Sequence, residues 1–211
     1  GGCLISHNNV SIDHKQVHLF DLKVMLDGRI LIAGIIQDGS TSVAVSLLHA
    51  DLSTIWVKTF DMPSFPLKLT ADLLDEKEIA LAVQLSSSVV YSKLDINGSA
   101  VWKKEVFPSG LTELVGFGNM VYTKMGLVMN CVINGNQTTE IAEILNSDGS
   151  LVSTHLMDDG IQENKMMDIS SFNERVHLIG AVKKSTGVFE LVRKIIYSSA
   201  RSETEHSYAI S

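Results

Sequence analysis

The chain contains little charge, few aromatic residues and almost no cysteine. Charged residues make up 19% of its 211 residues and aromatic residues 6%, against 45% hydrophobic residues. Acidic residues outnumber basic ones by 24 to 17 without long runs of either sign, which disfavours nucleic acid and anionic membranes as partners. No apolar stretch reaches the ~18 residues that a membrane helix requires, so no membrane span is expected. The composition indicates a globular domain under a weakly charged surface.

The two cysteines, Cys3 and Cys131, are far apart and match no metal or redox spacing. They exclude a disulfide framework, and we expect two unpaired thiols with Cys131 buried in a strand. The chain begins with Gly-Gly-Cys and without Met, so the lack of a signal peptide excludes no compartment. A Cys after Gly is also what remains at a lipoprotein cleavage site. An extracellular or periplasmic location is slightly favoured over a cytoplasmic one.

What the sequence does contain is short apolar runs, interrupted about every 8 to 12 residues by Gly, Asn, Asp or Ser, which predicts an all-β fold. Four segments align, each with a short stretch of apolar or small residues, a polar turn and an apolar run. The first residues of these runs are 49, 48 and 49 positions apart. The segments are VMLDGRILIAG (24–34), LLDEKEIALAV (73–83), VYTKMGLVMNC (121–131) and SFNERVHLIGA (171–181), aligned on Ile30, Ile79, Leu127 and Val176.

A second set of segments follows the first at a nearly constant distance. Its aligned residues, Leu48, Leu94, Leu145 and Ile195, are 46, 51 and 50 positions apart. Each repeat therefore contains a strand, a turn, a strand, a loop, a strand, a tight turn and a final strand. The sequence predicts a single domain over 1–211, built from four-stranded antiparallel units with a period of about 49 residues.

One segment also fits a helix. In TADLLDEKEIALAV (70–83), Thr70 could cap a helix, acidic residues crowd its first turn, and leucines recur near helical spacing. The aligned segments have Gly, Asn or Met-Gly where this one has Asp75 to Glu78. Because a periodic architecture constrains every copy, we predict a turn between two strands there.

The stretch LDINGSAVW (94–102) carries a resemblance to a known family. A repeated four-stranded unit of about 40 to 50 residues is typical of a β-propeller blade. Asp95, Gly98 and Trp102 resemble the blade motif of quinoprotein-type propellers, with the interval from Asp to Gly one residue shorter. The resemblance implies a propeller of four or five blades, with approximate boundaries at 18–60, 61–106, 107–156 and 157–211.

The other copies keep only part of this motif. The first keeps Asp51 and Trp56 but has Ser53-Thr54 where we place the Gly. The third keeps Gly149 and has Ser153 in place of Trp. The fourth, RKIIYSSARSET (193–204), has neither the Gly nor the Trp. The Asn-Gly pair supplies the positive φ that a tight hairpin requires. We expect Trp56 and Trp102, each on the last strand of its unit, to lie against a neighbouring sheet.

Residues 4–17 resemble the third-to-fourth-strand portion of a further blade and could supply closing strands. Two ways of closing the ring are possible. The ring could close within one chain, which we favour, or a partial ring could be completed by another chain, as in a homo-oligomer. An open ring would expose the flat faces of its end blades, and such surfaces normally associate.

No linear motif of catalysis, cofactor binding or metal binding occurs. His14 and His18 would lie ~13 Å apart on a strand, too far to share a metal. Asp158 and Asp159 precede Gly160 without the pattern of a calcium loop or a glycosidase pair, so we expect a polar loop. The sequons at Asn9, Asn97 and Asn136 fall in predicted turns, where Asn and Ser are common in any case.

We therefore predict no catalytic, cofactor-binding or metal-binding residues and expect no cofactor. The leading hypothesis is a non-enzymatic module that recognises a protein or saccharide ligand through loops at one mouth of the propeller. One alternative is a glycan-processing hydrolase or lyase, with an axial active site built from single residues on several blades. The other is a partial propeller completed by another chain. Fold alone favours none of these strongly.

Overall fold

The computed structural model describes residues 17–36, 38–39, 41–74, 76–106, 114–122, 126–133, 138–145, 148–156, 163–172, 175–183, 189–197 and 200–209. These residues form four antiparallel sheets of four strands each, which confirms the all-β prediction. The first sheet contains β1 (Val17–Val24), β2 (Ile30–Ile36), β3 (Ser42–Leu48) and β4 (Thr54–Asp61). The second contains β5 (Lys68–Leu74), β6 (Glu78–Gln84), β7 (Val89–Asp95) and β8 (Ala100–Val106).

The third and fourth sheets repeat this order. The third contains β9 (Leu114–Tyr122), β10 (Gly126–Ile133), β11 (Thr138–Leu145) and β12 (Leu151–Leu156). The fourth contains β13 (Glu163–Phe172), β14 (Arg175–Lys183), β15 (Phe189–Tyr197) and β16 (Ala200–Ala209). In every sheet the strands pair in chain order, so each sheet is a meander.

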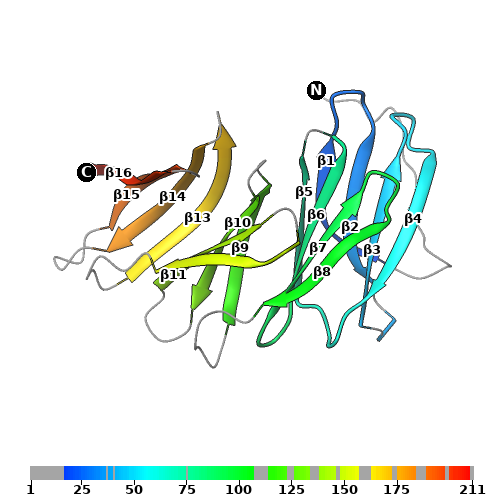
Figure 1. The fold of residues 1–211 in the computed structure, drawn as a ribbon, viewed down its shortest axis with the longest axis horizontal. Coiled ribbons are helices and arrows are strands. Elements are labelled where there is room, and N and C mark those ends of the chain that lie inside the picture. The colour runs from blue at the N-terminus through cyan, green and yellow to red at the C-terminus, as the bar shows by residue number, and fades with distance from the viewer. Residues whose placement is uncertain are drawn as a thin grey trace, which may run out of the picture.

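The four sheets stand face to face in an arc, with the first and fourth at its two ends (Figure 1). The first strands of neighbouring sheets contact one another: β1 lies beside β5, β5 beside β9, and β9 beside β13. These first strands therefore line the inner side of the arc. The arrangement places residues of equivalent register in different sheets near a common axis.

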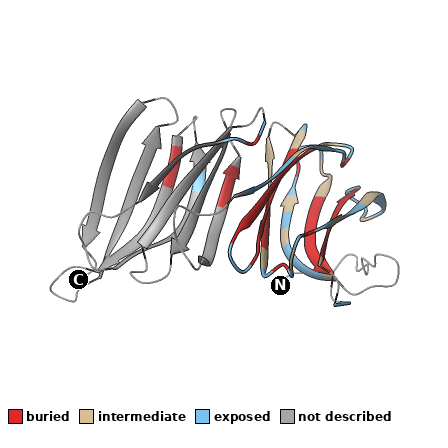
Figure 2. Ribbon diagram, turned by 60° about the horizontal axis from the view of Figure 1, so that its bottom comes forward, coloured by how far each residue is buried: buried red, intermediate tan, exposed pale blue. Residues whose placement is uncertain are grey.

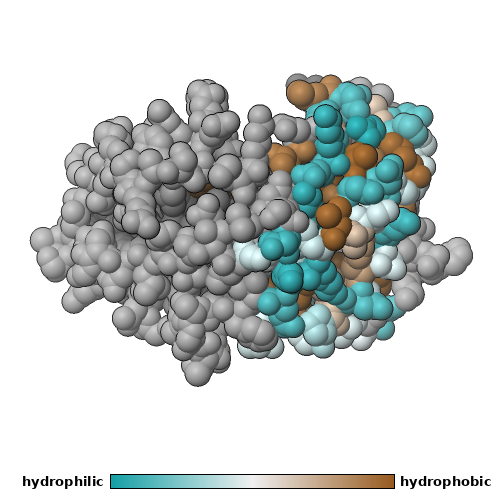
Figure 3. Space-filling model, in the orientation of Figure 1, coloured by the Kyte–Doolittle hydropathy of each residue, from teal (hydrophilic) through white to brown (hydrophobic). Residues whose placement is uncertain are grey.

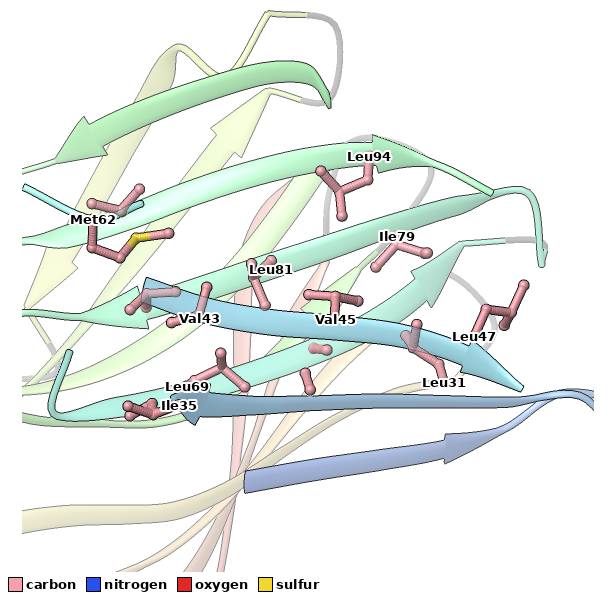
Figure 4. Close-up of a cluster of buried hydrophobic side chains, with 14 of the residues drawn as sticks. Leu31, Ile35, Val43, Val45, Leu47, Met62, Leu69, Ile79, Leu81 and Leu94 are labelled. Atoms are coloured by element: carbon pink, nitrogen blue, oxygen red, sulfur yellow. The ribbon is translucent and has the colours of Figure 1, made fainter. Parts of the chain in front are cut away.

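A core of buried apolar side chains lies between the first and second sheets (Figures 2 and 4). Every described residue of β3 is buried, and so are all residues of β2 except its first. Leu31, Val43 and Val45 face Leu69, Ile79 and Leu81 across the interface. Burial on both faces explains why these strands are continuously apolar and do not alternate with polar residues. The first and second sheets are held together chiefly by this apolar contact.

The segment 70–83 forms the strands β5 and β6, so the prediction of two strands is confirmed and the helical alternative is wrong. The Lys77 amide donates to the Leu74 carbonyl at 3.1 Å and closes the turn between them. Glu76, in that turn, has a φ of 57°. Its carboxylate accepts a hydrogen bond from the Leu26 amide in the first sheet. Glu76, one of the acidic residues that suggested a helical first turn, thus lies in a hairpin turn that contacts the first sheet.

Two hairpin turns share one backbone geometry, although only one has Gly at the critical position. In the β3–β4 turn the His49 amide donates to the Ser53 carbonyl at 2.8 Å, and in the β7–β8 turn the Asp95 amide donates to the Ser99 carbonyl at 2.9 Å. The residues of positive φ are Leu52 at 68° and Gly98 at 77°. Leu52 is therefore the residue equivalent to Gly98. Our prediction that Ser53-Thr54 takes the place of the Gly was wrong by one residue.

The two tryptophans join successive sheets, each at the last hairpin turn of the sheet that follows. The Trp56 indole on β4 donates to the Ile96 carbonyl of the second sheet at 3.0 Å. A Cβ added to Gly98 would lie 3.1 Å from the Trp56 ring, and one added to Gly149 would lie 2.6 Å from the Trp102 ring. Each Trp thus lies against a neighbouring sheet, as predicted, and the structure shows that it packs on the turn Gly of the following sheet. We call this contact the Trp–Gly joint.

Candidate functional site

The inner strand β1 carries a carboxylate that connects the first two sheets. The Thr70 hydroxyl donates to Asp21 Oδ2 at 2.7 Å, and the Ala71 amide donates to the same oxygen at 2.9 Å. The Leu22 amide donates to Asp21 Oδ1 at 2.9 Å, and Lys23 Nζ lies 3.8 Å from that oxygen. Both oxygens of Asp21 are therefore engaged, which fits a structural clamp better than a catalytic group.

A β-bulge in β1 positions Asp21. The register shifts between Leu19 and Asp21, so that Leu19 pairs with Gly34 and Asp21 with Ala33. Gly34 permits this close approach, because a Cβ there would lie 2.5 Å from the His18 carbonyl oxygen. The bulge turns the Asp21 side chain toward the second sheet, which is a common use of bulges.

Polar residues occupy the equivalent register positions of the other inner strands. Thr70 in β5 pairs with Ala82, as Asp21 in β1 pairs with Ala33. In β13 a second bulge separates Met166 and Asp168, and Asp168 pairs with Ile179. In β9 an irregularity lies between the paired residues Phe117 and Met120, where the sequence has Asn119. Residues 21, 70, 119 and 168 thus form one axial row, whose signal in the sequence is a polar residue every 49 positions.

The carboxylates of three turns accept hydrogen bonds from backbone amides. The Ser53 hydroxyl and then the Ser53 amide lower the pKa of Asp51, and the Ser150 hydroxyl and amide do the same for Asp148. The Arg29 amide holds the pKa of Asp27 below its ordinary value. Groups with lowered pKa values are ionised at neutral pH and accept hydrogen bonds. They are poor general acids.

Two lysines of the second sheet are paired or partly buried. Lys93 Nζ lies 2.7 Å from Glu78 Oε1 within the second sheet. Burial lowers the pKa of Lys68 at the start of β5. Among the described residues there is no group of three or more His, Cys, Asp or Glu that could hold a metal ion. The described part of the chain also holds no helix long and apolar enough to cross a membrane.

The loop between β4 and β5 exposes apolar side chains at one end of the strands, where β4 ends and β5 begins. Phe65 is 53% exposed and Leu67 51% exposed, although the Leu67 amide is anchored to the Gln84 carbonyl at 2.8 Å. The strand β1 begins at the same end, where the rings of His18 and Phe20 lie 4.8 Å apart. We call this end, with the loop 62–67 and the starts of β1 and β5, the mouth. Apolar areas lie scattered among polar side chains on the described surface (Figure 3).

Several residues that the sequence singled out can now be placed. His18 is exposed on β1 and Asn97 lies in the β7–β8 turn, where its amide donates to Asp95 Oδ1 at 2.9 Å. Cys131 lies in β10, as predicted, and its side chain is outside the described residues. Also outside them are Cys3, Asn9, His14, Asn136, Asp158, Asp159 and all but the last residue of the segment 4–17. The sequence did not point to Asp21, Phe65 or Leu67, which have no motif around them.

No family model matches the sequence, and no curated protein matches it. Its structure is similar to several solved β-propellers at low identity, which establishes the propeller fold and nothing finer. A GH43 glycoside hydrolase engineered for endo-xylanase and exo-arabinofuranosidase activity matches with a TM-score of 0.56 and 11% identity, over 93% of this chain and 42% of its own.

Two further propellers are similar to the same extent. The quinohemoprotein alcohol dehydrogenase of Comamonas testosteroni has a TM-score of 0.57 and 11% identity, over 90% of this chain and 35% of its own. A variant of the Synechocystis apocarotenoid oxygenase has a TM-score of 0.52 and 11% identity, over 88% and 47%. The chain thus spans less than half the length of each of these structures.

Proposed function

We propose that the chain is a non-enzymatic recognition module that binds a protein segment at the mouth of a propeller. The observation that carries this proposal is the exposure of Phe65 and Leu67 in a loop whose backbone is fixed to β6. Apolar and aromatic side chains held on an anchored loop bury surface against a partner at a small entropic cost. His18 and Phe20 at the start of β1 extend the same surface.

We further propose that residues 1–211 form one domain in which each sheet is one blade, with boundaries near 18–60, 61–106, 107–156 and 157–211. The strand order supports this assignment, because each of these intervals contains one meander, the first of them to within one residue at each end. The segment 4–17 would then contribute closing strands.

The competing function is a glycan-processing hydrolase with an axial active site, a class to which the similar GH43 enzyme belongs. Residues 21 and 168 of the axial row would supply its carboxylates. The bonds of Asp21 to Thr70 and Ala71 favour a structural role, since a general acid or nucleophile needs an oxygen directed at substrate. For this reason we rank the hydrolase second.

One experiment separates binding from hydrolysis. A phage-displayed random-peptide library is selected on the wild-type protein, and the enriched peptides are titrated against Phe65→Asp and Leu67→Asp. We expect each variant to weaken binding at least about tenfold, because it places a charge in an apolar contact. The control is Val101→Asp on β8, which is 54% exposed and lies near the opposite end of the sheet.

The hydrolase is tested in parallel with nitrophenyl xyloside and nitrophenyl arabinofuranoside. We expect no release of nitrophenol above the buffer rate. Nitrophenol release by the wild type that is lost in Asp21→Asn would rank the hydrolase above the recognition module. Failure to enrich any peptide, or peptides that bind Phe65→Asp and Leu67→Asp as well as the wild type, would refute recognition at the mouth.

A further inference from the structure

The face of the first sheet that points away from the second sheet, which we call the outer face, is buried at its centre. Its central residues belong to β2 and β3 and alternate with those of the core shared with the second sheet. Among them Ile32 is 5% exposed, Ile36 1%, Ala44 3%, Ser46 2% and Leu48 2%. A sheet face is this inaccessible only beneath a further layer. No described strand lies on that side, because the first sheet ends the arc (Figure 1). The outer face therefore has a cover that the described strands do not supply.

The cover does not extend to β1. Leu19 is 50% exposed, Leu22 57% and Val24 66%, although all three point to the outer face beside β2. A complete sheet covers more than this, because beneath the first sheet Leu69 of β5 is 2% exposed and Ala71 1%. The cover of the outer face is therefore narrower than a four-stranded sheet and lies over β2 and β3.

The stacking of the sheets shows which part of a sheet such a cover represents. The second strand of each sheet contacts the first strand of the next, since β2 lies beside β5, β6 beside β9 and β10 beside β13. With the same offset, the third and fourth strands of a preceding sheet would lie over β2 and β3, and its second strand over β1. A cover that leaves β1 exposed therefore corresponds to third and fourth strands alone.

The β3–β4 turn sets a further condition on the cover. In the second and third sheets the turn Gly receives a Trp from the fourth strand of the preceding sheet. The first sheet has Leu52 at this position, so the cover brings no Trp there. The N-terminal residues meet both conditions. Residues 4–17 resemble the third-to-fourth-strand portion of a blade, and residues 1–16 contain no Trp, Tyr or Phe.

We propose that residues 1–16, which lie outside the described part of the chain, cover the outer face over β2 and β3. They lead into Val17, which packs against Ile36 and Ala44 on that face. Extended chain spans ~3.3 Å per residue, so these residues reach about 50 Å, twice the ~23 Å length of β3. They are long enough to cross the face and return. Their apolar side chains are those of Leu4, Ile5, Val10 and Ile12. This inference goes beyond ligand recognition at the mouth and does not depend on it.

Thiol labelling in the full chain tests which side chains are covered. Single cysteines replace Ala44 on the outer face, Leu22 at its exposed edge and Val45 on the face joined to the second sheet. The background carries Cys3→Ser and Cys131→Ala. With dithionitrobenzoate we expect Ala44→Cys and Val45→Cys to react at least about tenfold more slowly than Leu22→Cys, because a thiol reacts only where the reagent reaches it.

Charges in the N-terminal segment should then expose the outer face alone. The double variant Val10→Asp, Ile12→Asp should raise the labelling rate of Ala44→Cys at least about fivefold, because a charge does not stay in an apolar contact. The cysteine between the two sheets should stay slow. The matched control is Asn8→Asp, Asn9→Asp, which adds the same charge at polar residues of the segment and should leave Ala44→Cys slow.

Three results would overturn the proposal. They are labelling of Ala44→Cys as fast as that of Leu22→Cys, slow labelling that persists in Val10→Asp, Ile12→Asp, and an equal increase in the control variant. Slow labelling that persists but is lost on dilution would assign the cover to a second copy. Persistence at every concentration would assign it to another part of the chain. Circular dichroism checks that each variant keeps its strands, and the milder Val10→Ser, Ile12→Ser replaces a variant that unfolds.

Discussion

The first sheet has one face joined to the second sheet and one face that points away from it, and alternate residues of its strands supply the two faces. On the joined face Trp56 packs on Gly98, and Asp21 accepts hydrogen bonds from Thr70 and Ala71. On the side that points away from the second sheet, Leu52 stands where the second sheet has Gly98. Leu22 is 57% exposed on that face, whereas Ala71, at the equivalent position of the second sheet, is 1% exposed.

This difference separates two roles of the turn glycine. The hairpin needs a residue of positive φ, and Leu52 meets that need at 68° despite its side chain. Packing of the Trp ring needs the absence of a Cβ, which Leu52 cannot provide. The Gly at this position therefore marks a joint between sheets as much as it marks a turn.

The largest expected effect comes from removing the ring that fills the joint. Trp56→Ala should lower the free energy of unfolding by about 3 kcal/mol, because it removes packing on the second sheet and the hydrogen bond to the Ile96 carbonyl. Urea denaturation measures the change. The control is Ile55→Ala, the neighbouring residue on β4 that is 37% exposed, for which we expect less than about 1 kcal/mol.

Adding a methyl group to the other side of the joint should have the next largest effect. Gly98→Ala should lower the free energy of unfolding by about 2 kcal/mol or more, since it combines an unfavourable φ with a contact to the Trp56 ring. Gly39→Ala is the control, because Gly39 has a φ of 80° with nothing within 4 Å of an added Cβ. It should lose only about 1 kcal/mol.

These two variants can also be combined. In the Trp56→Ala background the effect of Gly98→Ala should fall to that of Gly39→Ala. An unchanged effect would mean that the turn alone, and not the joint, requires Gly98.

The clamp on the joined face should contribute somewhat less. Asp21→Ala should lower the free energy of unfolding by about 2 kcal/mol, because it leaves the buried Thr70 hydroxyl and the Ala71 amide without their acceptor. Asp21→Asn keeps one acceptor oxygen and should lose less. Equal losses in the two variants, in the same urea titration, would argue that charge and not hydrogen bonding decides the contribution.

At Leu52, on the side of the first sheet that points away from the second, the expected change has the opposite sign. Leu52→Gly should raise the free energy of unfolding by about 0.5 kcal/mol, since relief of the left-handed strain slightly exceeds the added entropy of the unfolded chain. Thermal denaturation at a fixed protein concentration measures it. A loss of 1 kcal/mol or more would contradict the difference that we draw between the two turns.

The smallest effect concerns the acidity of the turn carboxylates. The pKa of Asp51 in the folded chain lies below its ordinary value of 3.8, so its stabilising contribution is present above that value and is lost as the pH falls through the folded pKa. Asp51→Asn should therefore be less stable than the wild type at neutral pH, and the difference should vanish in strong acid. A difference that grows as the pH falls would contradict this assignment.

Much of the architecture followed from comparing repeats. The sequence predicted strands over 70–83 against local helical propensity, because all copies had to share one structure, and it predicted that Trp56 and Trp102 pack between sheets. Leu52 could not be recognised as the left-handed residue, since Leu seldom adopts a positive φ and only the backbone reveals it. Asp21 likewise has no local motif, because its partners Thr70 and Ala71 lie on another sheet and its orientation depends on a bulge.

The sequence predicted ligand binding by loops at the mouth of the propeller but identified none of the residues there. That Phe65 and Leu67 are exposed there depends on how the loop 62–67 is anchored, and the anchor is a backbone hydrogen bond that carries no residue preference. The sequence does not distinguish Leu19, Leu22 and Val24 from buried residues of a strand. Their exposure reflects their place on an end sheet, which is a property of the arc and not of the residues.

The meander order of each sheet has a consequence for how the chain folds. Strands within a sheet are neighbours in sequence, whereas the contacts between sheets span longer intervals, 40 residues from Trp56 to Ile96 and 49 from Asp21 to Thr70. Short-range pairings form before long-range ones, because the entropy of closing a loop rises with its length. Each sheet should therefore form early and dock late, and folding should spread along the arc from one sheet to the next, as in other repeat proteins.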